Sequence, residues 1–134
     1  MESRLGYLVL AENVIVDAGT RALTPIKIFD TFIIPKKEPF LLHPSLWIAG
    51  RFYIPSSVGE SLSATMSIVD PNGSEIQNIL LEGSIVADQG VNVAGKFSLL
   101  KFENVGEHVV KLNAKIGSAE YDFGSTPFFV LKGN

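Results

Sequence analysis

Apolar and polar residues alternate along much of this chain, and this pattern limits its fold more than any other feature. From Ser61 to Ile68 every second residue is apolar, and the others are serines and a threonine. Residues 110–116 repeat the pattern with two lysines and an asparagine between the apolar positions. Successive side chains of a β-strand point to opposite faces, so the alternation predicts strands with one face in a core. It also fixes the register, because a slip of one residue would bury both lysines.

Turn residues separate these segments at the spacing typical of β-sandwiches, and no stretch of helical length keeps a 3.6-residue period. The strongest turn signal is Asp70-Pro71-Asn72-Gly73, which has a proline at its second position and a glycine that tolerates positive φ. The sequence predicts an all-β fold, an antiparallel two-sheet β-sandwich with about eight strands. The predicted segments are 7–16, 22–34 with an interruption at Pro25 and an end at Pro35, 46–54, 60–69, 76–87, 93–102, 109–116, 119–123 and 127–131.

A chain of 134 residues is long enough to bury one core, and nothing in it resembles a linker, so residues 1–134 are expected to form a single domain. Its composition is unusual for a small domain, because 46% of the residues are apolar and 19% are charged. A domain of this size has limited interior for such content. We therefore expect some apolar surface to meet a protein partner or a second copy of the chain.

Charge and cysteine content exclude several classes of function. The 11 basic and 14 acidic residues are scattered, so no basic stripe exists that would bind nucleic acid or anionic lipid. No apolar run approaches the roughly 20 residues that span a bilayer. The apolar start, Leu5 to Ala11, is broken by Glu12 and lacks the cleavage site of a signal peptide. The absence of cysteine fits a reducing compartment, so we expect a cytoplasmic protein.

No residue pattern for catalysis, cofactor binding or metal binding is found. No serine has glycine two positions away on both sides, so the nucleophile elbow of hydrolases is absent. His43 precedes Pro44, which favours a loop, and His108 stands at a predicted strand start. The two histidines lack the short spacings of zinc sites, and the aspartates stand singly. We expect no catalytic residue, no cofactor and no metal, with solvated or backbone-bonded imidazoles.

Trp47, Arg51 and Tyr53 are the candidate binding residues. They share one face of the predicted strand 46–54 with Ala49, whereas Leu46, Ile48, Phe52 and Ile54 point the other way. In one interpretation the three form a flat aromatic and arginine surface, suited to a protein hot spot or a sugar ring. In the other, Trp47 packs into a second half of the core and Arg51 extends its charged head to water. A lone tryptophan in an apolar domain favours the second interpretation.

The end of the chain resembles the closing hairpin of immunoglobulin-like sandwiches. The resemblance runs from Gly106-Glu107-His108-Val109-Val110-Lys111-Leu112 through Gly117 to Phe128-Phe129-Val130. In those folds a strand that begins at glycine pairs through a short turn with a terminal strand of aromatic and β-branched residues. The cysteines and the paired tryptophan of true immunoglobulin domains are missing here, so the resemblance implies their architecture alone.

Three other segments are similar to those of a group of small bacterial sandwich proteins without an assigned function. These segments are Leu10-Ala11-Glu12-Asn13-Val14, Lys27-Ile28-Phe29-Asp30 and Val69-Asp70-Pro71-Asn72-Gly73. The similarity implies the same sandwich fold and carries no activity.

Three functions therefore remain open from the sequence. The first is a non-enzymatic interaction or assembly module that self-associates or docks on a protein through an apolar sheet face or edge. The second is a carbohydrate-binding domain that stacks sugars on Trp47 and Tyr53. The third is an enzyme with a site built from His43 or His108.

Overall fold

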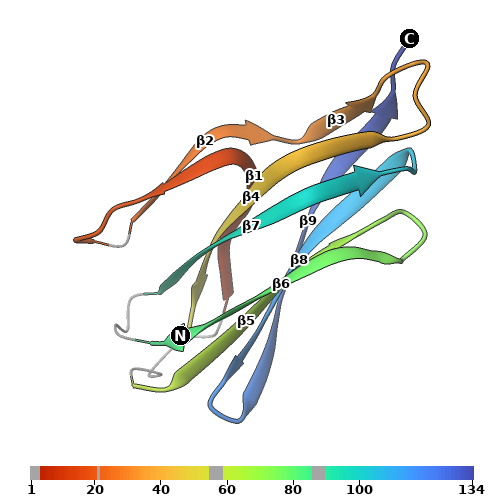
Figure 1. Cartoon of the computed structure of the whole chain (residues 1–134). Coiled ribbons are helices and arrows are strands. Elements are labelled where there is room, and N and C mark those ends of the chain that lie inside the picture. Colours follow the sequence, from red (N-terminus) through yellow and green to blue (C-terminus); the bar gives the residue numbers. More distant parts are fainter. Residues whose placement is uncertain (1–3, 21, 55–58, 86–89) are drawn as a thin grey trace.

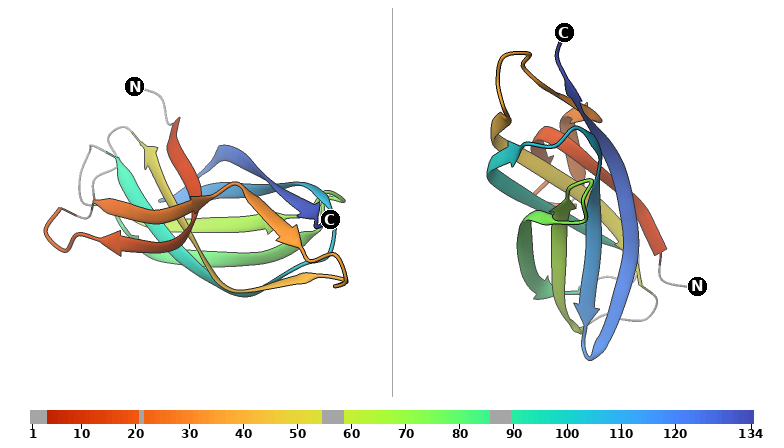
Figure 2. Two further views of the ribbon diagram at one scale, coloured as in Figure 1. Left: turned by 90° about the horizontal axis from the view of Figure 1, so that it is seen from above. Right: turned by 90° about the vertical axis from the view of Figure 1, so that its right-hand side faces the viewer.

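The computed structural model describes residues 4–20, 22–54, 59–85 and 90–134. Within these ranges the chain forms strands and no helix. The strands are β1 (Arg4–Val16), β2 (Leu23–Phe29), β3 (Thr31–Ile34), β4 (Leu41–Tyr53), β5 (Ser61–Val69), β6 (Glu75–Ser84), β7 (Val91–Phe102), β8 (Gly106–Ile116) and β9 (Ala119–Lys132). One sheet has the order β2-β1-β4-β7 and the other has the order β3-β9-β8-β5-β6. The two sheets lie face to face, which confirms the predicted two-sheet β-sandwich, with nine strands in place of about eight (Figures 1 and 2).

The core lies between the sheets and is formed by the residues that the alternation predicts. The inward residues of β4 at positions 46, 48 and 52, Ile54 directly after it, and the inward residues of β8 at positions 110, 112, 114 and 116 are all buried. Phe52, Phe97, Phe102 and Phe128 are the largest side chains that are fully covered. The predicted register of β8 is therefore confirmed, because its lysines face away from the core.

The segment from Leu23 to Ile34 departs from the prediction, because it forms two strands that belong to different sheets. β2 is an edge strand of the four-stranded sheet, and β3 is an edge strand of the five-stranded sheet, parallel to β9. The predicted interruption at Pro25 was wrong, since Pro25 lies within β2. An edge strand tolerates proline because one of its sides has no partner. The break falls at Asp30, where the chain crosses between the sheets, and the strand ends before Pro35 as predicted.

His43 was predicted to lie in a loop, but it lies within β4, which begins at Leu41. Its ring packs edge-on against Phe29 and Phe32, at centroid distances of 5.9 and 5.6 Å. The pairing of β4 with β7 continues on both sides of Pro44. Proline therefore does not end the strand here, because the partners on either side of it hold the ladder.

β9 was predicted as two strands, but it is one strand with a bulge. Leu112 pairs with Gly124 and Asn113 pairs with Asp122, so Phe123 is the extra residue of β9. Gly124 takes a φ of +104°, and its N–H donates to the Asp122 side-chain oxygen at 2.9 Å. A bulge of this type shifts the alternation by one residue.

The predicted turn at residues 70–73 is confirmed. Gly73 has a φ of +86°, and the N–H groups of Asn72 and Ser74 both donate to Asp70 Oδ1 at 2.9 Å. These backbone bonds hold the pKa of the Asp70 carboxyl below its usual value. The turn therefore joins β5 to β6 as the sequence indicates.

Candidate functional site

Trp47, Arg51 and Tyr53 lie on β4, on the face of the four-stranded sheet that points away from the core. All three side chains are half-buried. Trp47 and Arg51 are four residues apart, which corresponds to about 13 Å along an extended strand. The three residues therefore belong to two groups, one around Arg51 and Tyr53 and one around Trp47, and Tyr7, the partner of Arg51 in β1, lies between them.

The first group joins Arg51 and Tyr53 to side chains of β1 and β7. Arg51 donates from Nε to the Tyr53 hydroxyl oxygen at 3.1 Å and from Nη1 to the Asn92 side-chain oxygen at 2.8 Å. The Cζ atoms of Arg4 and Arg51 lie 5.0 and 5.1 Å from the centroid of the Tyr53 ring. Burial raises the pKa of the neighbouring Tyr7 phenol, although the positive charge of Arg51 acts in the opposite direction. These contacts link three adjacent strands on the outside of the sheet.

Two glycines sit directly against the ring of Tyr53. A Cβ atom on Gly6 would lie 2.9 Å from Tyr53 Cε2, and one on Gly90 would lie 3.0 Å from Tyr53 Cδ1. Real Cβ atoms essentially never show the contact at Gly6, and the contact at Gly90 is tighter than nine in ten real ones, so a side chain at either glycine would need the Tyr53 ring to shift. The tyrosine ring is thus packed between neighbours and does not offer a broad open face for a sugar ring.

The second group is a hydrophobic cluster outside the core. Ala11, Val14 and Ala49 are buried there, and Tyr7, Val9, Leu23, Trp47 and Ala94 pack against them half-buried. In the sheet Trp47 lies between Ala11 of β1 and Lys96 of β7. The small neighbouring alanines allow an indole to cover them while part of it stays accessible. The residues from β1 and β7 were missed by the sequence analysis, which considered strand 46–54 alone.

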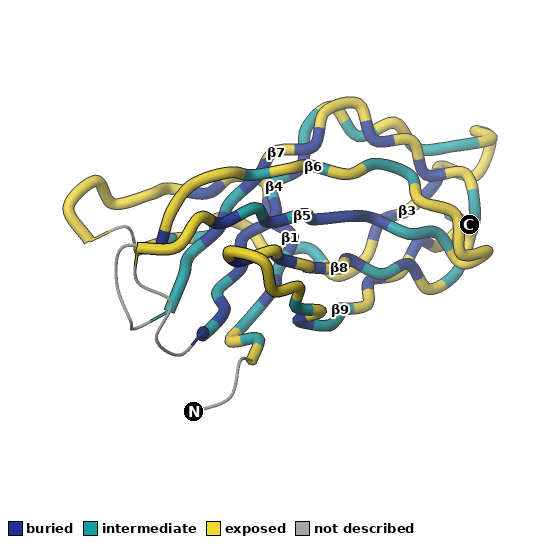
Figure 3. The backbone as a smooth tube through the Cα atoms, turned by 90° about the horizontal axis from the view of Figure 1, so that it is seen from below, coloured by how far each residue is buried: buried dark blue, intermediate teal, exposed yellow. Residues whose placement is uncertain are grey.

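The outer face of the five-stranded sheet is divided along its strands into an apolar end and a polar end. Figure 3 shows the alternation of buried and exposed residues along β8 and β9 that creates this outer face. At the apolar end Ile33, Val105, Phe129 and Leu131 are 56, 53, 44 and 46% exposed. We call these four residues the β3–β9 patch. The sequence carried a signal for it, because residues 128–131 are all apolar, so that the outward positions of this segment are apolar as well as the inward ones.

The polar end contains a shallow hollow of about 550 Å³. Its polar lining consists of Ser63 and Thr65 of β5, Asn113 and Lys115 of β8, and Glu120 and Asp122 of β9. These residues are cross-strand neighbours, since Asn113 pairs with both Thr65 and Asp122. Neutral hydroxyl and amide groups lie here beside one ammonium group and two carboxylates. The surface is therefore polar and has no dominant charge.

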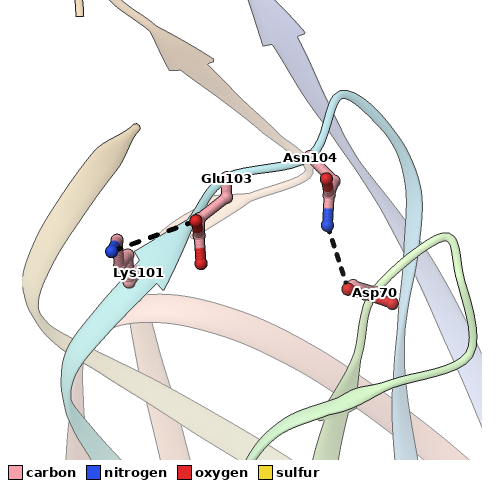
Figure 4. A network of polar contacts seen from close by, with 4 residues as sticks. All are labelled: Asp70, Lys101, Glu103 and Asn104. Carbon is pink, nitrogen blue, oxygen red and sulfur yellow. Dashed lines mark hydrogen bonds and ion pairs between the residues drawn. The ribbon is translucent and has the colours of Figure 1, made fainter. Parts of the chain in front are cut away.

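A second hollow, of about 310 Å³, lies at the end of the sandwich where the β5–β6 turn meets the β7–β8 connection. Figure 4 shows its two polar contacts: Asn104 Nδ2 donates to Asp70 Oδ2 at 3.0 Å, and Lys101 Nζ lies 3.9 Å from Glu103 Oε2. Asp70 already accepts the backbone bonds of its own turn. Its carboxylate therefore fastens two connections together and is not free to act as an acid or base.

His108 lies beneath this hollow and is fully buried. Its Nδ1 is 3.1 Å from the Gly106 carbonyl oxygen, and its Nε2 has no hydrogen-bond partner among the residues that the structure describes. The ring packs against Phe102 and Phe128 at centroid distances of 5.6 and 5.2 Å. Burial lowers the pKa of His108 more than the Gly106 carbonyl and the Asp70 charge raise it. The imidazole is therefore held neutral, as a backbone-bonded member of an aromatic cluster.

Within the described ranges no three histidine, cysteine, aspartate or glutamate residues gather as metal ligands would. The same part of the chain contains no helix of the length and hydropathy needed to cross a membrane. The sequence matches no protein-family model, and a comparison with curated proteins also gives no match. Function must therefore be argued from the surfaces described above.

Proposed function

We propose that this protein is a non-enzymatic interaction module that self-associates and docks a protein partner. The observation that carries the proposal is the position of its apolar side chains. Trp47 and its neighbours form a hydrophobic cluster outside the core, and the β3–β9 patch is exposed on the opposite sheet. Apolar surface gathered in this way is typical of protein-binding sites.

The Trp47 cluster is proposed as the docking site for a protein partner. Tryptophan, tyrosine and arginine are the residues most enriched among binding hot spots. Trp47 supplies an apolar anchor, and Arg51 and Tyr53 supply polar groups whose positions are already fixed by hydrogen bonds. Groups that are ordered before binding lose less conformational entropy when the partner arrives.

Sedimentation velocity over a range of micromolar concentrations tests self-association. We expect the sedimentation coefficient to rise with concentration, and a strict monomer at every concentration would contradict the proposal.

Trp47 is the only tryptophan of the chain, so its fluorescence reports on one surface alone. A blue shift on adding a partner protein would place that partner on the Trp47 cluster, and Trp47→Ala should weaken its binding about tenfold or more.

The absence of catalysis is part of the same proposal. His43 and His108 pack among phenylalanines, and within the described part of the chain neither imidazole is hydrogen-bonded to a carboxylate. A general base needs such contact with its substrate or with an orienting group. A double variant, His43→Ala with His108→Ala, that loses a measured activity while it remains folded would support an enzyme instead.

The accessible part of the Trp47 indole favours a second candidate, a carbohydrate-binding domain. The packed ring of Tyr53 contributes little to it, so Trp47 alone would stack on the sugar. A glycan-array comparison of the wild type with Trp47→Ala tests this candidate. Signals that persist in the variant, or no signals at all, remove it.

The proposal also includes the location, the class of partner and the architecture expected from the sequence. The absence of cysteine supports a reducing, cytoplasmic location, and the scattered charges argue against nucleic acid as a partner. The hairpin of β8 and β9 supports an immunoglobulin-like architecture for the sandwich.

A further inference from the structure

The β3–β9 patch is arranged symmetrically about strand β9. Leu131 pairs with Ile33 of β3 on one side. On its other side Gly106 pairs with Val130, so continuing this antiparallel register by one residue puts Val105, which directly precedes β8, opposite Leu131. Phe129 occupies the next outward position of β9. A rotation of 180° about a line along β9 therefore exchanges Ile33 with Val105 and leaves Leu131 and Phe129 in place.

We propose that two copies of this chain dock face to face through the β3–β9 patch, with the two-fold axis along β9. This inference rests on the proposed self-association and names the surface that performs it. In this arrangement Ile33 of each copy packs on Val105 of the other, and Leu131 and Phe129 each meet their own equivalents. A two-fold interface requires such a self-complementary surface.

The charges around the patch are compatible with this arrangement. Phe129 pairs with Thr31 on one side and with Glu107 on the other, so the axis places Glu107 of one copy opposite Thr31 of the second. A hydroxyl can donate a hydrogen bond to a carboxylate. Lys111 lies further along β8, past the point where β3 ends in the facing copy. Like charges are therefore kept apart, whereas like charges brought together would oppose association.

Edge-to-edge pairing of the two β3 strands is the main alternative, and the sequence opposes it. β3 is only 4 residues long and is followed directly by Pro35. Short edge strands bounded by proline are a common protection against sheet extension. Docking of the faces, rather than of the edges, also covers the apolar side chains that the patch exposes.

The size of the overlap indicates the strength of the dimer. The facing strip consists of β3, β9 and β8, which at about 4.8 Å per strand is roughly 14 Å wide, and the 4 residues of β3 make it roughly 13 Å long. Such a strip buries less than the about 800 Å² per partner of a standard interface. The dimer should therefore be weak and should dissociate in the micromolar range, where sedimentation can follow it.

Single cysteines can locate the axis, because the natural chain contains none. We expect Leu131→Cys to form a covalent dimer with a short bismaleimide, since facing sheets lie about 10 Å apart. Ile33→Cys and Val105→Cys should cross-link with each other when mixed, and much less when each is alone. Leu80→Cys on β6 is the control, because Leu80 is 55% exposed but lies at the opposite edge of the sheet. Equal cross-linking of Leu80→Cys and Leu131→Cys would overturn the inference.

Sedimentation separates failure of the interface from failure of the proposed function. Leu131→Lys places two ammonium groups at the axis and should weaken the dimer by about 100-fold or more, whereas Leu80→Lys should leave it unchanged. A wild-type dimer that persists in Leu131→Lys overturns the interface and leaves self-association standing. A wild type that stays monomeric at all concentrations overturns both. Circular dichroism confirms that the variants remain folded.

Discussion

The outer faces of the two sheets handle apolar residues in different ways. On the four-stranded sheet, Trp47 packs over small alanines and the Tyr53 ring is enclosed by arginines and glycines. On the five-stranded sheet, the residues of the β3–β9 patch are neighbours across and along the strands, and each is about half exposed. The first face is a second packed layer that contributes to folding. The second is a surface whose stabilising contacts are available only to a partner.

The difference teaches that exposure and packing have to be considered together. A half-buried group such as Arg51 with Tyr53 is fixed by contacts inside the chain, so changing it should affect stability first. A patch without such contacts should affect association first. Substitutions on the outer face of the four-stranded sheet should therefore change the stability, and those in the β3–β9 patch should change the association. Matched pairs of residues allow this comparison to be tested.

The largest change in the free energy of unfolding is expected at two glycines with positive φ, Gly90 beside Tyr53 and Gly124 in β9. Gly90→Ala should lower the free energy of unfolding by about 3 kcal/mol, because alanine is strained at positive φ and its Cβ would also meet the Tyr53 ring. The φ of Gly90 is +118°, and the nearest Tyr53 atom would be 3.0 Å from that Cβ. Urea denaturation provides the measurement.

Gly124 in β9 is the matched control for Gly90. Its φ is +104°, but a Cβ atom there would have no neighbour within 4 Å. Gly124→Ala should therefore show the backbone strain alone, about 1–2 kcal/mol. Equal losses in the two variants would mean that the Tyr53 ring is not packed against the backbone, and the contrast between the faces would be weakened.

A smaller loss of stability is expected when a single hydroxyl is removed from one tyrosine of each sheet, Tyr53 on the outer face of the four-stranded sheet and Tyr121, which packs against the core from the five-stranded sheet. Tyr53→Phe deletes the acceptor of the Arg51 Nε–H bond and should lower stability by about 1 kcal/mol. Tyr121→Phe in β9 is the control, since Tyr121 stacks on Phe123 with its ring and has no hydrogen bond from its hydroxyl among the contacts of the described residues. Thermal unfolding should shift only for Tyr53→Phe. The comparison would fail if both variants shifted alike.

The sequence predicted the two-sheet fold well because alternation reports burial directly. The inward residues of β4, β5 and β8 could be assigned before any coordinates were known. Errors arose where alternation shifts or where sheets change. The bulge at Phe123 shifts the pattern of β9, and the crossing at Asp30 divides β2 from β3 without a proline or glycine to mark it. Such features depend on which strands become neighbours, and this is decided by the whole fold.

The candidate sites were predictable only in part for the same reason. Alternation placed Trp47, Arg51 and Tyr53 on one face, and they do share it. It did not reveal that Asn92 fixes Arg51 or that Gly90 encloses Tyr53. Asn92 follows Arg51 by 41 residues in the chain, and Gly90 directly precedes the same strand, β7. The β3–β9 patch likewise needs the pairing of Ile33 with Leu131, two residues that are far apart in the sequence.

The smallest expected effect is a gradual fall of stability with falling pH, and it tests whether the two sheets unfold as one cooperative unit. Burial lowers the pKa of His108 below its ordinary value of 6.5, so the unfolded chain takes up a proton first as the pH falls. The free energy of unfolding should therefore decline below about pH 6.5 and be independent of this group above it. The carboxyls of Asp17 and Asp70 have pKa values below 3.8 and stay outside this window.

His108 belongs to the five-stranded sheet and Trp47 to the four-stranded sheet, so the two report on different layers. Unfolding followed by Trp47 fluorescence and by circular dichroism should shift together with pH, as one domain requires. His108→Phe keeps an aromatic ring among Phe102 and Phe128 and should remove the decline below pH 6.5. If the slope survives in this variant, another group titrates there. If the two probes separate, the layers unfold independently, and the stabilities of the two faces would have to be measured one sheet at a time.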